Sequence, residues 1–207
     1  MRHQATRELH AYWDVMRGER TAPDRQDFDP VAIRSVLGDT FMLDVEPAAT
    51  YSVCLSGERV NRLFNLGLKG QSFISLFAAP EQAKMAKLCA SICDESLPVV
   101  AGLLAAPQGH TPIALEMVLL PVRHFSKTHA RILGAISPAF SPEWLGEAPI
   151  EPISLVSIRM LIADHRQRRN LASPGNTLRR ASEIQASACN ILPVARRAHL
   201  TVYNGGR

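Results

Sequence analysis

Four basic side chains gather between two apolar runs in the stretch LEMVLLPVRHFSKTHARILGAISP. They are Arg123, His124, Lys127 and His129. Side chains of these types could bind an anion or, for histidine, exchange a proton with a substrate. The same pattern is typical of a hairpin whose polar turn meets water while its two strands enter the core. We favour the hairpin, and keep Arg123 and Arg131 as the polar candidates for contact with an anion.

A single carboxylate, Glu116, interrupts the first of these apolar runs. It could face a cavity and hold a ligand, or it could form an ion pair with Arg131 on the neighbouring strand. Buried carboxylates without a partner are rare, so the ion pair is the favoured expectation.

Two further groups with reactive chemistry, Cys89 and Cys93, are spaced i, i+4 on a predicted helix. They could share a metal, but two ligands alone leave a zinc site incomplete. Free cysteine is among the most buried residue types, so packing in the core is the favoured reading and no metal site is expected. The four cysteines form neither a disulfide framework nor a zinc knuckle, which favours a reducing cytoplasm.

Motifs of the common enzyme classes are missing from the chain. The sequence has no nucleophile elbow, no phosphate-binding glycine loop and no paired catalytic carboxylates. We therefore expect no catalytic residues. No apolar run is long enough to span a bilayer, and the charged N-terminal residues do not resemble a secretory signal.

The elements that must position these side chains follow from the hydrophobic periodicity. Residues 3–17 predict a helix with one apolar stripe, and Asp29-Pro30 predicts the start of a short helix over PVAIRSVLG. Two strands follow, TFMLDVE and YSVCLSG, then the helical pieces GERVNRLFNLG, LKGQSFISLF and PEQAKMAKLCASICDESL. Three more strands end the pattern: PVVAGLLAA, PIALEMVLLPV and ARILGAISPAF.

This order predicts an α+β fold: a five-stranded antiparallel sheet with helices on one face and an N-terminal helical extension. The last three strands are apolar on both faces. Exposing either face to water would cost about 25 cal/mol per Å² of apolar surface, so both faces should be covered. The central helices can cover one face. The N-terminal helix, a second subunit, or both must cover the other.

The pattern divides the chain into four parts. They are the N-terminal helices at 1–38, the sheet domain at 39–141, a connector at 142–165 and a basic tail at 166–207. Within the connector, ISLVSIRMLIA could be one more strand or a helical segment. The tail holds eight arginines and no sustained periodicity, so most of it is expected to be disordered.

The arginine tail gives the alternative function, a nucleic-acid-associated regulator. Clustered arginines bind phosphate backbones, although the tail lacks the interleaved aromatic side chains that stack on bases. Nucleic acid is therefore not the expected partner. Deleting the tail and measuring retention on heparin or DNA columns would separate the two functions.

Several stretches resemble a bacterial PAS-like domain family over roughly residues 10–140. They are the opening YWDVMRGER with APDRQDFDP, the strand-to-helix stretch YSVCLSGERVNRLFNLGLKGQSF, and the strand pair LEMVLLPV and RILGAISP. Two positions depart from the family pattern. Cys54 stands where members often carry a basic residue, and RHFSKTH replaces a turn that often contains acidic residues and glycine.

The resemblance implies a sensory or regulatory module in bacterial signalling. Such a module would act by small-ligand binding, by docking of a signalling protein through the sheet, or by pairing with a second copy as a homodimer. The cofactor is left open, with flavin and haem not expected, because GERVNRLFNLG holds no cysteine and the long helix holds no histidine. The residues expected to line a ligand cavity are Phe64, Phe73, Ile74, Leu88, Ile92, Met117, Leu119, Ile132 and Ile136.

Overall fold

The computed structural model describes residues 1–46, 50–107, 109–124, 127–150 and 152–161, together with two short segments near the C-terminus. The chain forms two compact units, Met1–Ile162 and Ala163–Arg207. In the second unit, β7 (Ala195–Arg197) and β8 (Leu200–Val202) form an antiparallel pair. The rest of the predicted tail lies outside the described residues.

The first unit is built on one antiparallel sheet of six strands in the order β2-β1-β5-β4-β3-β6. The predicted strand pair is confirmed as β1 (Thr40–Val45) and β2 (Tyr51–Ser56). The three later strands are confirmed as β3 (Val99–Ala105), β4 (Ile113–His124) and β5 (Lys127–Pro138). Because β4 and β5 lie near the centre, residues on them can reach elements on both sides of the sheet.

The prediction of five strands is wrong by one, because part of the connector, β6 (Ile153–Met160), joins the sheet. It pairs antiparallel with β3, with Ala105 opposite Ile153 and Val99 opposite Met160. This pairing satisfies backbone groups of β3 that would otherwise form a sheet edge. The sequence left strand and helix open here because a short apolar run fits both periods.

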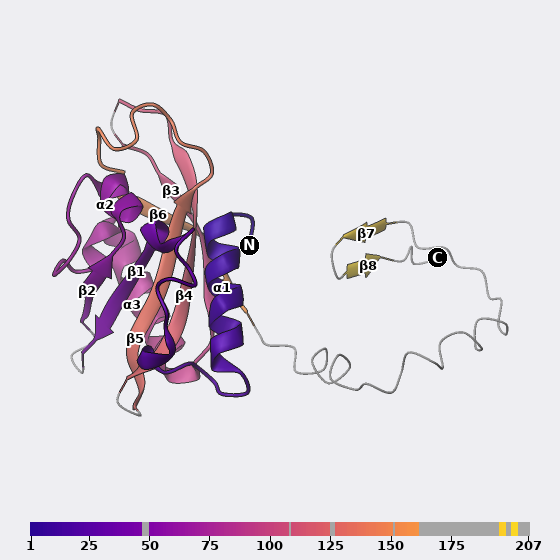
Figure 1. The fold of residues 1–207 in the computed structure, drawn as a ribbon. Coiled ribbons are helices and arrows are strands. Elements are labelled where there is room, and N and C mark those ends of the chain that lie inside the picture. The colour runs from indigo at the N-terminus through magenta and orange to yellow at the C-terminus, as the bar shows by residue number, and fades with distance from the viewer. Residues whose placement is uncertain are drawn as a thin grey trace, which may run out of the picture. The chain divides into compact units, whose positions relative to one another are not determined.

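Three α-helices cover the two faces of the sheet (Figure 1). The predicted N-terminal helix is confirmed as α1 (Gln4–Arg17), and the two central helices as α2 (Glu58–Phe64) and α3 (Ala79–Glu95). A single 3₁₀ turn, η3 (Ile74–Leu76), lies between α2 and α3. Figure 1 shows α1 on one side of the sheet and α2 and α3 on the other.

Alternation along β4 and β5 builds two separate hydrophobic cores. Met117 and Leu119 join the inner core, between the sheet and α2 and α3. Val118 and Leu120, on the opposite face of the same strand, join the outer core with Leu9 and Trp13 of α1. The expectation that both faces are apolar and covered is thus confirmed, and within this chain α1 covers the outer face.

The short helix predicted after Asp29-Pro30 is wrong. Residues 30–36 form consecutive turns with i→i+3 hydrogen bonds, such as Val36 N–H to the Ile33 carbonyl at 3.0 Å, and a 3₁₀ turn, η2 (Leu37–Asp39), follows. β-branched side chains at Val31, Ile33 and Val36 weaken an α-helix. The i, i+3 spacing of a 3₁₀-like turn still buries Ile33 and Val36 against the outer core.

The strands around the basic turn are longer than predicted. His124 of β4 pairs with Lys127 of β5, so the RHFSKTH segment is mainly strand, with residues 125 and 126 between the two ends. The side chains of residues 124 and 127–130 lie outside the described part of the structure. The prediction that they form a solvated basic turn therefore falls on residues that the structure does not describe.

Close packing of two loops fixes where α2 begins. Gly57 precedes α2, and its N–H donates to the Thr40 carbonyl at 2.7 Å. A Cβ atom at this position would stand 2.3 Å from the Gly38 carbonyl oxygen, so the backbone approach requires glycine. The strand-to-helix stretch quoted above therefore has a steric basis.

Candidate functional site

The nine residues predicted to line a cavity all lie in the inner core or pack against it. Phe64 comes from α2, Leu88 and Ile92 from α3, and the rest from η3 and its flank, β4 and β5. Phe73 stacks on Phe41 with ring centroids 5.3 Å apart. The fold thus brings the predicted residues together in the space between the sheet and the helices.

That space is filled by side chains. The void among these residues holds about 10 Å³, which is about the space of one water molecule. Phe64, Phe73, Met117 and Ile136 are among its walls. A small organic ligand could enter only if the helices moved on the sheet.

Glu116 has neither of the partners expected for it. Opposite Glu116 on β5 is Ser137, whereas Arg131 lies opposite Val122. The Glu116 carboxylate accepts hydrogen bonds from the N–H groups of Arg2 at 2.9 Å and His3 at 3.1 Å, and from the Thr6 hydroxyl. The expected ion pair with Arg131 is therefore wrong, and so is a cavity-facing role.

These contacts make Glu116 a cap for α1 supplied by the sheet. His3 occupies the N-cap position without a side-chain hydrogen bond, and the first turn carries no acidic residue. A carboxylate at this end satisfies free N–H groups and interacts well with the helix dipole. Burial opposes ionisation, but the hydrogen bonds from Thr6, His3 and Arg2 outweigh it and lower the Glu116 pKa.

The two candidate arginines each meet an aspartate. Arg131 Nε lies 2.8 Å from Asp44 of β1, and Arg123 Nε lies 3.5 Å from Asp24. Arg123 also donates its backbone N–H to the Pro23 carbonyl at 2.9 Å. Both side chains therefore connect β4 and β5 to neighbouring segments of the chain.

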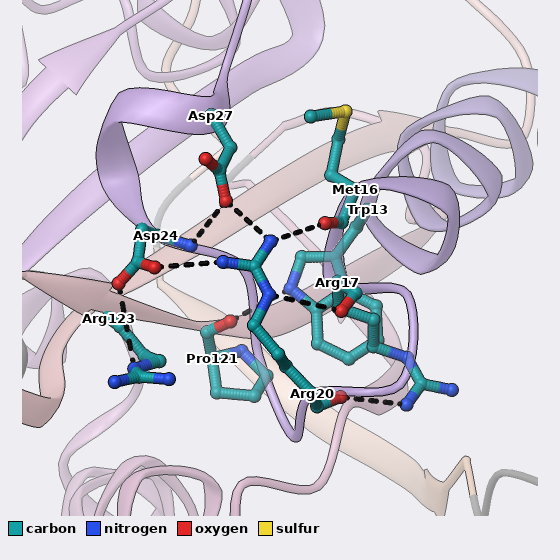
Figure 2. Close-up of polar contacts among 8 residues, drawn as sticks. All are labelled: Trp13, Met16, Arg17, Arg20, Asp24, Asp27, Pro121 and Arg123. Atoms are coloured by element: carbon teal, nitrogen blue, oxygen red, sulfur yellow. Dashed lines mark hydrogen bonds and ion pairs between the residues drawn. The ribbon is translucent and has the colours of Figure 1, made fainter.

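Sequence reasoning missed a polar cluster at the end of α1, which we call the α1 clamp and define as Arg20, Asp24, Asp27 and Arg123 (Figure 2). Arg20 makes ion pairs with Asp24 at 2.8 Å and Asp27 at 2.7 Å. The same guanidinium donates to the carbonyls of Met16 and Arg17 in the last turn of α1. One side chain therefore ties the end of the helix to the turn that follows it.

Other residues of the same sequence stretch hold α1 against β4. The Trp13 indole N–H donates to the Pro121 carbonyl at 2.8 Å, and the Arg17 guanidinium lies over the Trp13 ring at 5.2 Å (Figure 2). Gly18 ends the helix with a φ of 57°, a backbone conformation that residues other than glycine rarely adopt. The signal in the sequence is the opening YWDVMRGER with APDRQDFDP, which carries the family resemblance and also holds these residues.

The cysteines of α3 lie in the inner core. Cys89 and Cys93 are buried there, and burial raises the pKa of both thiols, that of Cys93 to about 11. Among the residues that the structure describes, no group of three or more His, Cys, Asp or Glu side chains could hold a metal ion. Packing in the core, the favoured reading, accounts for both positions.

The described helices include none with the length and apolar character needed to cross a membrane. The arginine tail, on which the alternative nucleic-acid function depends, lies almost entirely outside the described part of the structure.

Comparison with known proteins agrees with this arrangement. A search of curated proteins finds no match to the chain. The family model for the PAS domain matches residues 1–137, which include α1, the α1 clamp, most of both cores and the strands β1 to β5 apart from the last residue of β5. PAS domains are sensory or regulatory modules, and they commonly mediate protein interactions. The chain belongs to the PAS domain family.

Proposed function

We propose that this chain is a regulatory PAS module of bacterial cytoplasmic signalling. A small ligand or a partner protein favours one packing of the helices on the sheet, and this packing decides what the outer face of the sheet binds. The module has no catalytic step of its own. Its partner is a signalling protein or a second copy of the chain.

One observation carries the proposal: β4 and β5 contribute alternate residues to both cores. Met117 and Val118 are neighbours in the chain, yet one packs under α3 and the other under α1. Because packed interiors transmit strain, a change between the sheet and α3 is felt by the residues that seat α1. The nine predicted cavity residues belong to the inner core or pack against it, so they lie on the α3 side of these shared strands.

The contacts that dock α1 on the sheet suit a helix with two states, docked and released. It combines an apolar stripe, including Leu9 and Trp13, with polar contacts at each end, Glu116 at the start and the α1 clamp at the finish. Release of the helix would expose the apolar side chains of Val118, Leu120 and Val122, which form a surface for a partner.

Hydrogen exchange and native mass spectrometry of the full chain test the proposal. We expect α1 amides to exchange faster than those of β4 and β5, and a bound small molecule or a dimer to accompany a change in α1 exchange. A bare monomer in which α1 exchanges as slowly as the central strands, with no partner or ligand altering it, would contradict the proposal.

A matched pair of variants sharpens this test. Leu9→Ala removes a fully buried contact of α1, whereas Val15→Ala changes a side chain on the same helix that is 76% exposed. Leu9→Ala should increase α1 exchange and self-association or partner capture, and Val15→Ala should change neither. Faster exchange without any change in association would refute the docking role of the outer face.

A further inference from the structure

A large space lies on the outer side of the sheet, apart from the inner core. It is a cleft of about 520 Å³ between residues 25–38 and the strands β1 and β2. Pockets for small molecules commonly have about 300–1,000 Å³, so the cleft is large enough for one. It is separate from the nine inner-core residues of the proposed ligand cavity.

The walls of the cleft are mainly apolar. They include Phe28, Ile33, Leu37, Met42, Leu55 and Leu133. Leu37 is 41% exposed and Leu55 is 49% exposed, although both lie beside buried core residues. Apolar walls left open to water favour an occupant with an apolar body.

Two arginines, Arg25 and Arg34, also line the cleft. Within the described part of the chain, neither guanidinium takes part in an ion pair with a carboxylate. The Nε atom of Arg25 is also buried and has no hydrogen-bond partner there. A buried donor without a partner is rare in folded proteins, and an anionic group in the cleft would supply one.

The carboxylates around the cleft do not oppose an anion at Arg25. Asp24 and Asp27, on either side of that arginine, are engaged by Arg20 of the α1 clamp (Figure 2). Glu58 is the one carboxylate among the lining residues that the structure describes, and it follows Gly57 near the start of β1.

The register of the sheet separates Glu58 from Arg25. Gly57 bonds to Thr40, at the first residue of β1. Asp24 forms an isolated β-bridge with Arg123. The preceding residue, Val122, pairs with Arg131 of β5, and Arg131 pairs in turn with Asp44 of β1. Thr40 and Asp44 are four residues apart, about 13 Å along a strand. Glu58 therefore lies at a different end of the cleft from Arg25.

We propose that this cleft binds an amphipathic organic anion. The apolar body lies against Met42, Leu55 and Leu133, and the anionic head, a carboxylate or a similar group, lies at Arg25 and Arg34. The inference goes beyond the proposed function, because such binding does not depend on the inner core or on the release of α1.

Calorimetric titration of the full chain with decanoate tests the proposal, with decanol as the uncharged probe of the same chain length. We expect saturable binding of decanoate at one site and binding of decanol weaker by about tenfold, the loss of a charge-assisted contact. Equal affinities, or no saturable binding of decanoate, would overturn it.

Variants locate the site. Arg25→Gln and Arg34→Gln should each weaken decanoate binding severalfold and leave decanol binding unchanged, whereas Leu55→Ser should weaken both. Arg159→Gln is the matched control, because Arg159 is exposed on β6, at the opposite edge of the sheet from β2. Decanoate binding that Arg159→Gln weakens as much as Arg25→Gln does would show a nonspecific charge effect and reject the site.

Discussion

Glu116 shows how a single buried carboxylate can be satisfied without a cationic side chain. Its oxygens accept two backbone N–H groups and the Thr6 hydroxyl, all from the start of α1. Such bonds favour the charged form, which is why the pKa is lowered in spite of burial. A group whose folded pKa is lowered stabilises the fold above its ordinary pKa, and this stability is lost as the pH falls through the folded value.

The first prediction concerns this carboxylate. Glu116→Ala should lower the free energy of unfolding at pH 7 by about 1.5–3 kcal/mol, because it leaves donors of the helix start without a charged partner. Glu116→Gln should flatten the loss of stability below about pH 4.5, measured by urea unfolding across a pH series. Glu95→Gln, at an exposed residue, is the control; the same flattening there would contradict the assignment to Glu116.

The second prediction concerns the thiols of α3. In a Cys54→Ser, Cys189→Ser background only Cys89 and Cys93 remain, and burial raises the pKa of both. The thiolate is the reactive form, so an aromatic disulfide reagent at pH 8 should label neither until denaturant is added. Absorbance of the released thiolate measures the reaction, and rapid stoichiometric labelling of the folded protein would refute it.

At the scale of elements, α1 depends on contacts with distant parts of the chain. Its start is capped from β4, its middle bonds to the Pro121 carbonyl, and its end is fastened by Arg20. A helix of 14 residues is marginal by itself in water, so its stability comes chiefly from this docking. The polar contacts set its position, while the buried stripe supplies most of the favourable free energy.

The third prediction tests the α1 clamp. Arg20→Ala should lower the free energy of unfolding by about 1–2 kcal/mol, a value kept modest because the Arg20 side chain is 39% exposed. Hydrogen exchange should rise in the last turn of α1 and in residues 21–28, and stay unchanged in α3. Glu19→Ala, at the exposed neighbouring residue, is the control. Equal rates of hydrogen exchange in the Arg20→Ala and Glu19→Ala variants would contradict the proposed role of the α1 clamp.

The whole first unit is a sheet with two cores that share their strands. Met117 lies on the inner side of β4 and Val118 on the outer side. In the fourth prediction, Met117→Ala costs about 2–5 kcal/mol of stability, as for other buried large-to-small changes. It should also raise hydrogen exchange in α1, although Met117 belongs to the core on the other face. An effect confined to α2 and α3 would contradict the coupling that the proposed function needs.

The second unit gives the fifth prediction. All six strands of the main sheet, and both cores apart from one partly buried contact at Leu161, lie in residues 1–160. Deletion of residues 166–207 should therefore leave the thermal unfolding midpoint of the first unit unchanged. The same variant tests the alternative function, binding of nucleic acid through the arginine tail. If the tail binds polyanions, its deletion should abolish retention of the protein on a heparin column. A large fall in the unfolding midpoint would show that the tail supports the fold.

Several features of this protein could be predicted from the sequence because they depend on near neighbours. The stripe of Leu9 and Trp13 has helical spacing, and the alternation through Met117 and Val118 has strand spacing. The two apolar faces of β4 required a cover on each side, and the nine cavity residues gathered as the alternation implied. The PAS resemblance rested on the same local stretches and is confirmed by the family match.

Tertiary structure alone decided the partner of Glu116, the filling of the inner core, the pairing of β6 and the outer cleft. Thr6 is 110 residues from Glu116 in the chain, and they meet because α1 crosses β4 at that level. The void of about 10 Å³ depends on how side chains from α2, α3 and the sheet interdigitate. Such contacts are set by the relative placement of whole elements, which local periodicity does not encode.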